Sequence, residues 1–156
     1  MPKQGRNPPR GAPPASLQLV SQYAAALAAQ DSAVMAALRA PDYALDYVHL
    51  DAFAGEPQSA QAADAFWPAW FAGFPEMDFE ITRTIAAESV VVIQWVFSGT
   101  QSGTLQAQVF GRQIEPTGRT IRLRGVGVYD LSEGLIQRET LYLDYATLWV
   151  ELGVEL

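Results

Sequence analysis

Residues 119–153 constrain the fold most, because they read as one long β-hairpin followed by a helix. The stretch is RTIRLRGVGVYDLSEGLIQRETLYLDYATLWVELG. A strand over about Thr120–Leu131 and a second over about Leu135–Leu143 are joined by a tight turn at Ser132-Glu133-Gly134. Gly134 supplies the positive φ that such turns often need. This pattern predicts a curved sheet whose open end is closed by the helix that follows.

The remaining elements are predicted from capping residues and from apolar spacing. Pro41 is expected to stop the second helix, and Pro68 to kink or split the third. The helices are expected to begin at Ser16, at Asp31 or Ser32, at Ser59 and at Asp144, and the last one to end at Gly153. The other strands are expected over Tyr43–Asp51, Met77–Thr82, Val90–Phe97 and, more weakly, Leu105–Phe110. The order predicts an α+β fold: a curved antiparallel sheet that forms a cone, about three N-terminal helices and a short C-terminal helix.

Length and composition indicate one globular domain. The chain has 156 residues, of which 49% are apolar and 17% charged. Residues 1–15 are Pro-rich and basic and are expected to form a disordered tail, with a single domain over 16–156. No apolar run reaches the roughly 18 residues that a membrane helix needs, and the start lacks the apolar segment of a signal peptide. We therefore expect a cytoplasmic protein with no membrane partner.

The charge and the missing residue types exclude several kinds of site. The net charge is −7, and without the three basic residues of the tail the body carries 7 basic and 17 acidic residues, a net charge of −10. This sign repels phosphate backbones, so no nucleic-acid partner is expected. The absence of cysteine excludes disulfides and thiolate metal sites, and a single histidine argues against zinc. No metal and no cofactor are expected.

Two segments carry a family resemblance. They are PTGRTIRLRGVGVYDLSEGLIQRETLYLDYATLWVELG, which ends at residue 153, and DAFAGEPQSAQAADAFW, residues 51–67. With the order of elements, they resemble the SnoaL-like polyketide cyclases of the nuclear transport factor 2-like superfamily, over roughly residues 16–153. The second segment also resembles ketosteroid isomerases, in which an aspartate base precedes an E-P-x-S motif, matched here by Asp51, Glu56, Pro57 and Ser59. The resemblance implies Asp51 as base and Tyr23 as a hydrogen-bond donor to a substrate oxygen.

The sequence departs from each catalytic set that the resemblance suggests. The protonated aspartate of the isomerases falls at Gly127, and the acid–base histidine and aspartate of the cyclases fall at Gly127 and Leu141. The arginine and aspartates of the related limonene-epoxide hydrolases would fall at Trp95, Phe97 and Leu141. The family's pocket is therefore expected with different contents.

Strand alternation predicts which side chains line that pocket. If residue 127 faces inward, Tyr129 does so too, and Glu139 and Leu141 share one face of the next strand. The expected ligand contacts are mainly aromatic: Trp95, Phe97, Tyr129, Leu141, Trp67, Trp70 and Phe71. The polar candidates are Asp51, Glu139, His49 and Tyr23. Two carboxylates in an apolar cavity would raise one pKa, which sets a general acid beside a base.

Each polar candidate also has a structural interpretation. Asp51 can cap a loop, His49 can lie on an exposed strand face, and Tyr23 belongs to the apolar stripe of the first helix. A register slip of one residue would turn Glu139 toward water. Arg122 and Arg124 alternate with the inward residues, so the outer sheet face carries them and is the expected contact of a homodimer.

The sequence thus predicts a cofactor-independent acid–base enzyme for a hydrophobic cyclic or polyketide-like small molecule. Asp51 would be the base, helped by Glu139 or His49, and Tyr23 or Tyr129 would polarise an oxygen. Aldol-type cyclisation, isomerisation and epoxide opening all fit. A non-catalytic module that binds an apolar small molecule is the alternative, and the departures at Gly127 and Leu141 favour it.

Overall fold

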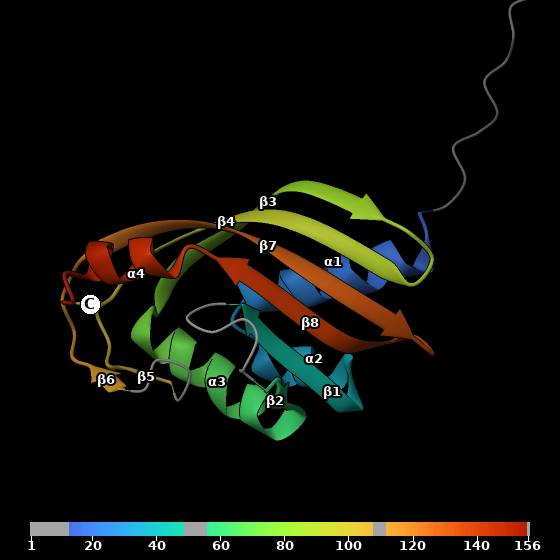
Figure 1. Ribbon diagram of the computed structural model, residues 1–156, viewed down its shortest axis with the longest axis horizontal. Helices are drawn as coiled ribbons and strands as arrows, with labels where there is room; N and C mark the ends of the chain where they lie inside the picture. Colours follow the sequence, from blue (N-terminus) through green and yellow to red (C-terminus); the bar gives the residue numbers. More distant parts are fainter. Residues whose placement is uncertain (1–12, 49–55, 108–111, 156) are drawn as a thin grey trace, which may run out of the picture.

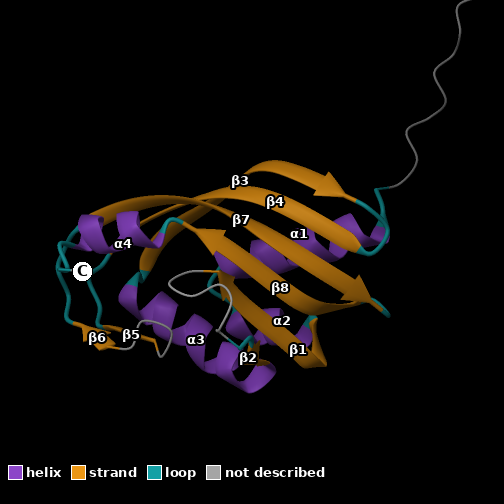
Figure 2. Ribbon diagram, viewed as in Figure 1, coloured by secondary structure: helices purple, strands orange, loops and turns teal. Residues whose placement is uncertain are grey.

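The computed structural model describes residues 13–48, 56–107 and 112–155, so the candidates Asp51 and His49 lie outside the described residues. Four helices are described, α1 (Ala15–Ala28), α2 (Ser32–Ala37), α3 (Ala60–Gly73) and α4 (Tyr145–Leu152). The strands are β1 (Arg39–Val48), β2 (Gln58–Ser59), β3 (Glu76–Ala86), β4 (Val90–Thr100), β5 (Leu105–Ala107), β6 (Arg112–Ile114), β7 (Thr120–Ser132) and β8 (Leu135–Leu143). The predicted α+β class is confirmed (Figures 1 and 2).

One large curved sheet organises the molecule. Its strand order is β2-β1-β8-β7-β4-β3, and β5 pairs with β6 in a separate hairpin. The β7–β8 hairpin lies in the middle of the sheet, as the sequence predicts (Figure 1). All pairs in the large sheet are antiparallel except β1 with β8, which is parallel. The sheet is therefore mixed, because the chain passes from β1 through α3 before it returns to the hairpin.

Helices cover one face of this sheet and its end. α1 contacts β3 and β4, α3 contacts β1 and the β5 strand, and α4 contacts β7 (Figure 2). The core lies between these helices and the inner sheet face, where the alternate residues of β4 are buried. None of the described helices is both long enough and apolar enough to cross a membrane.

Local capping explains most helix ends. Asp31, Ser59 and Asp144 accept from the backbone amides of Val34, Ala62 and Thr147, so each caps the helix expected to follow it. Gly134 and Gly153 have positive φ, at 74° and 71°.

The first and third helices differ from expectation in detail. α1 begins at Ala15, and the Ser16 hydroxyl, instead of capping the helix, donates to the carbonyl of Ala87 at 2.6 Å. That bond ties α1 to the end of β3. α3 runs through Pro68 as one helix and is not split.

The start of β1 is the largest difference in the strand boundaries. The strand begins at Arg39, before Pro41, although Pro41 was expected only to end a helix. Arg39 pairs with Ile136, and regular pairing resumes at Ala44 with a shift in register. Pro41 is tolerated because it lies in this irregular stretch, where its missing amide breaks no ladder.

Two glycines of β7 leave room for aromatic rings on the inner face. Gly125 pairs with Trp95, and a Cβ atom at Gly125 would lie 2.2 Å from the Trp95 ring. A Cβ at Gly127 would lie 2.9 Å from the Tyr129 ring. Both rings therefore pack directly against the glycine backbone of β7, where a larger residue would collide with them.

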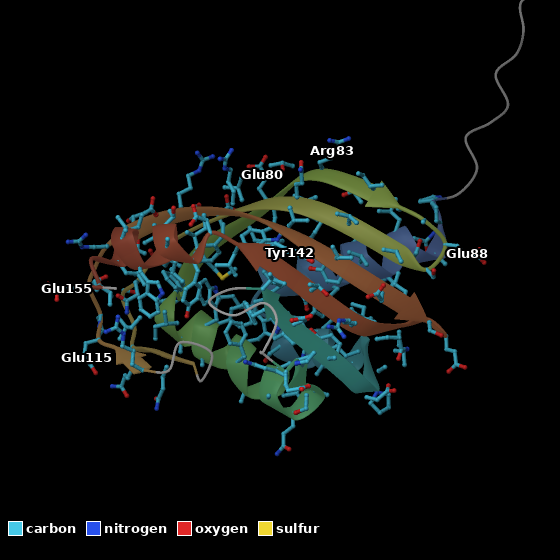
Figure 3. The ribbon with its side chains drawn as sticks, in the orientation of Figure 1. Glu80, Arg83, Glu88, Glu115, Tyr142 and Glu155 are labelled. Carbon is cyan, nitrogen blue, oxygen red and sulfur yellow. The ribbon has the colours of Figure 1, made fainter. Side chains whose placement is uncertain are left out.

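The outer sheet face carries polar side chains among half-exposed valines. Arg124 is exposed and Val126 is half-buried on β7, and the Tyr142 side chain is 48% exposed on β8 (Figure 3). This is the face that the sequence assigns to a homodimer contact, and that assignment stays a prediction.

Gly125→Ala tests the close packing of Trp95 on β7. We expect a loss of about 1–3 kcal/mol in the free energy of unfolding, because the buried indole must leave its place. Urea denaturation measures it, with Val126→Ala on the half-buried outer face as the control, expected to cost less than about 1 kcal/mol. Equal losses in the two variants would contradict this packing.

Candidate functional site

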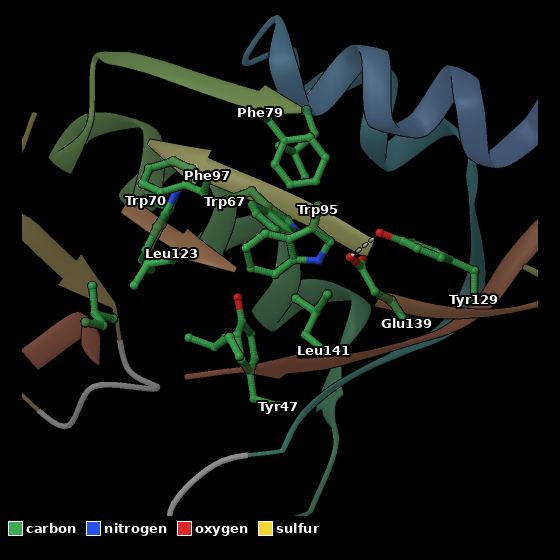
Figure 4. Close-up of a pocket in the computed structure, with 13 residues that line it drawn as sticks. Tyr47, Trp67, Trp70, Phe79, Trp95, Phe97, Leu123, Tyr129, Glu139 and Leu141 are labelled. Atoms are coloured by element: carbon green, nitrogen blue, oxygen red, sulfur yellow. Dashed lines mark hydrogen bonds between the residues drawn. The ribbon is translucent and has the colours of Figure 1, made fainter. Parts of the chain in front are cut away.

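An apolar cavity lies between the inner sheet face, α1, α3 and α4. The space open there to the centre of a water molecule is about 50 Å³. This is room for a few waters. Its described lining is Leu27, Tyr47, Trp67, Trp70, Phe79, Trp95, Phe97, Leu123, Tyr129, Glu139, Leu141, Leu143 and Leu148 (Figure 4).

Glu139 is the one ionisable carboxyl in this described lining, and it is completely buried. It pairs with Tyr129 across the hairpin. A bulge places one extra residue on β8, because Asp130 pairs with Arg138 while Leu131 pairs with Ile136. This extra residue turns both Ile136 and Glu139 inward. The outward-facing alternative for Glu139 is therefore wrong.

Three tyrosine hydroxyls donate to the Glu139 carboxyl. Oε2 accepts from Tyr43 at 2.6 Å and from Tyr23 at 2.9 Å. Oε1 accepts from Tyr129 at 3.1 Å (Figure 4). The hydroxyls come from β1, α1 and β7, so two elements remote in sequence and the neighbouring strand of the hairpin converge on one carboxyl. Oε1 keeps a lone pair beyond the Tyr129 bond, on the carboxyl that borders the cavity.

Arg39 supplies the positive charge behind this cluster. Its Nε and Nη2 atoms donate to the Tyr23 hydroxyl at 3.1 and 2.9 Å. Its Nη1 atom donates to Asp64 on α3 at 2.9 Å. The guanidinium also lies over the rings of Tyr23 and Tyr43, with its central carbon 5.4 and 5.0 Å from their centroids. The Glu139 charge is thus balanced through Tyr23 and not by direct contact.

These surroundings raise the pKa values of Glu139 and of the three tyrosines. Burial raises the pKa of the Glu139 carboxyl, while the hydrogen bonds from Tyr43 and Tyr23, the Arg39 charge and the Tyr129 bond oppose that rise. Burial first, and then the nearby Glu139 charge, raise the pKa of all three tyrosines well above their ordinary value. The tyrosines therefore stay protonated and act as donors at neutral pH.

The structure brings most of the predicted site residues together. Glu139 lines the cavity with six of the seven predicted ligand contacts: Trp95, Phe97, Tyr129, Leu141, Trp67 and Trp70. The seventh, Phe71, is not in the described lining, and its ring stacks on Trp67 with centroids 6.1 Å apart. Tyr23 is also outside the described lining, and its single hydroxyl proton points to Glu139, so it is not placed as a donor to a ligand.

The sequence patterns did not indicate Arg39, Tyr43 or Tyr47 as site residues. Tyr43 and Tyr47 lie on β1, and Figure 4 shows the Tyr47 hydroxyl directed into the cavity. The available signal was the inward register of Glu139, since a buried carboxylate requires donors and a cation. The sequence does not show which residues supply the donors, because Tyr43 and Tyr23 lie 96 and 116 positions away from Glu139.

Tyr129 brings a hydroxyl group to the inner sheet face beside Gly127. Its ring lies over Gly127, and its hydroxyl reaches Glu139. A polar group therefore stands over this part of the sheet even though residue 127 has no side chain. The cluster as a whole can hold or release one proton at Glu139 in an otherwise apolar wall.

Tyr43→Phe tests the support of the Glu139 carboxylate. Because the folded-state pKa of Glu139 is raised, its contribution to stability falls as pH rises from about 4.5 through the folded pKa. Losing the Tyr43 hydroxyl raises that pKa further, so the variant should lose about 1.5–3 kcal/mol at pH 8 and less at pH 4.5. Urea denaturation at both pH values measures the difference. Tyr142→Phe, with an exposed ring, is the control, and an equal loss at both pH values would contradict the assignment.

Comparisons with solved structures show the same fold. A SnoaL-like polyketide cyclase candidate from Jannaschia sp. CCS1 aligns with a TM-score of 0.73 and 16% identity, over 95% of this chain and 100% of that one. IdmH from Streptomyces antibioticus, described as a candidate polyketide cyclase, aligns with a TM-score of 0.69 and 20% identity, over 89% and 99% of the two chains.

AclR from Streptomyces galilaeus, described as a candidate hydroxylase, aligns with a TM-score of 0.74 and 17% identity, over 88% of this chain and 80% of that one. At these identities the likeness shows the fold alone. No curated protein sequence matches the chain. The model of the SnoaL-like domain matches residues 20–139, which include the larger part of α1, the β7–β8 hairpin as far as Glu139, and most of the cavity wall. The chain therefore belongs to the SnoaL-like domain family.

Proposed function

We propose that this protein is a cofactor-independent acid–base enzyme that acts on a hydrophobic cyclic or polyketide-like small molecule. The observation that carries the proposal is Glu139, a fully buried carboxyl on the wall of an aromatic cavity. A protein core rarely keeps a carboxyl unless it is paired or functional. The fold is shared with cyclase and hydroxylase candidates, which supports a small molecule as the substrate.

Glu139 can take a proton from a carbon next to a carbonyl group. The C–H bond breaks and its electron pair forms a carbon–carbon double bond, while the π pair of the carbonyl moves onto the oxygen. Oε1 of Glu139 holds the proton until it returns to the product. The raised pKa of Glu139 favours this exchange, because an acid–base group works best when its pKa lies near the working pH. The tyrosines hold the carboxyl in place, and the cavity excludes water from the enolate.

The same proton transfer begins an aldol-type cyclisation or an isomerisation. Epoxide opening would instead need water activated by the carboxylate. Asp51 as the principal base and His49 as a relay stay predictions, since both lie outside the described residues. Either would supply the second acid–base group that cyclisation requires.

A non-catalytic binding module is the second candidate. Two observations favour it: residues 127 and 141 lack the acids of related enzymes, and the Glu139 carboxyl already accepts three hydrogen bonds. Under this alternative the tyrosine cluster is only a structural solution for a buried charge. Ligands would then bind without chemical change.

Glu139→Gln separates the two functions. With the bicyclic ketone 2-tetralone as probe in D2O, the wild type should speed the replacement of hydrogen beside the carbonyl by deuterium, measured by NMR. The variant should lose about 100-fold or more of this rate while ketone affinity stays within a few-fold, because a general base contributes 10²- to 10⁴-fold. Asp51→Asn, assayed in parallel, tests the predicted second carboxylate.

Glu80→Gln is the matched control, since Glu80 is an exposed glutamate of β3 that points away from the sheet (Figure 3). It should exchange the probe at the wild-type rate. Binding of the ketone without accelerated exchange by the wild type would favour the binding module. Exchange that survives in Glu139→Gln would remove Glu139 from the chemistry.

A further inference from the structure

Trp67 carries a buried hydrogen-bond donor that has no acceptor. The residue lies on α3, is 7% exposed and forms part of the cavity wall. Within the described ranges its Nε1 atom has no hydrogen-bond partner, and it is the only buried side-chain nitrogen or oxygen there in that condition. Leaving such a donor unpaired is costly, so it calls for an explanation.

The neighbours of Trp67 explain why the donor stays unpaired. The indole meets Phe66 edge-on, with centroids 5.1 Å apart, and stacks on Phe71 at 6.1 Å. These rings hold the indole in place but offer no oxygen. An oxygen on a molecule in the cavity that Trp67 borders would satisfy this donor.

The charge of the wall limits what that occupant can be. None of the lining residues in the described part of the chain is a lysine or an arginine, and Arg39 lies behind Tyr23. A carboxylate or phosphate ligand would lose its hydration without gaining a counter-charge, and Glu139 would repel it. A neutral carbonyl oxygen needs only a neutral donor, which Trp67 supplies.

We infer that Trp67 donates its indole N–H to the carbonyl oxygen of a neutral, flat, mainly apolar ketone, while Glu139 faces the acidic C–H beside that carbonyl. This inference rests on the proposed function and names its substrate class. When Glu139 takes the proton, the electron pair of the C–H bond forms a carbon–carbon double bond, the π pair of the carbonyl moves onto its oxygen, and the bond from Trp67 then stabilises the enolate. Returning the proton to carbon restores the ketone.

Trp67→Phe tests the donor, because phenylalanine keeps an aromatic ring at this position but has no N–H group to donate. We expect 2-tetralone to bind the variant about 5- to 10-fold more weakly than it binds the wild type, and tetralin, the same bicycle without oxygen, to change less than two-fold. NMR titration measures both affinities. Trp149→Phe is the matched control, since Trp149 is a buried tryptophan of α4 outside the described lining, and it should leave both affinities unchanged.

A second readout needs no substitution at Trp67. The chain has four tryptophans, so ¹⁵N labelling should give four indole N–H signals, which Trp→Phe changes at the other three assign by elimination. The Trp67 signal should move downfield with 2-tetralone and not with tetralin. This measurement stands even if Trp67→Phe does not fold.

Three results would overturn the inference. They are an equal loss of affinity for both ligands in Trp67→Phe, no loss for either, or a wild type that does not prefer 2-tetralone to tetralin. The proposed function is judged separately. If exchange depends on Glu139 but ketone affinity does not depend on Trp67, this inference is refuted and the proposed function stands. If the protein binds the ketone selectively but does not accelerate exchange, the enzymatic function is refuted and the Trp67 contact stands.

Discussion

Burying the carboxyl of Glu139 is the constraint on which much of this structure depends. A carboxylate that leaves water without partners is far too costly for a domain of this size, so donors must converge on it. Hydroxyls from α1, β1 and β7 do so, and Arg39 balances the charge through Tyr23. The cluster thereby fixes how the first helix, the parallel strand and the hairpin meet.

The sheet itself is adapted to that cluster. The bulge in β8 turns Glu139 inward next to Leu141, and the glycines at 125 and 127 let the rings of Trp95 and Tyr129 lie against β7. The aromatic side chains of α3 close the cavity from the other side. The result is an apolar chamber with a proton-holding group on its wall and an unsatisfied donor on α3. Such a chamber suits reactions in which charge moves within a neutral ring system.

The sequence predicted the parts that local interactions determine. Helix caps at Asp31, Ser59 and Asp144 and the turn at Gly134 depend on neighbours within a few residues, and the structure has them all. Alternation also placed Glu139 and the aromatic wall on the inner face. The hydrogen bonds that link Arg39, Tyr23 and Glu139 could not be predicted, because these residues are far apart in the sequence and meet only in the folded chain. The early start of β1 was missed for a related reason: Pro41 indicates a break locally, and only pairing with β8 makes the segment a strand.

The most direct test of Glu139 as an acid–base group is its own titration. Side-chain ¹³C-carboxyl labelling of glutamate, followed by NMR from about pH 3 to 9, resolves this residue once Glu139→Gln has assigned its signal. Burial should place its midpoint above the value of about 4.3 that glutamate has in a model peptide. A Glu139 midpoint at or below that reference value would leave a permanently ionised structural carboxylate and contradict its role in proton transfer.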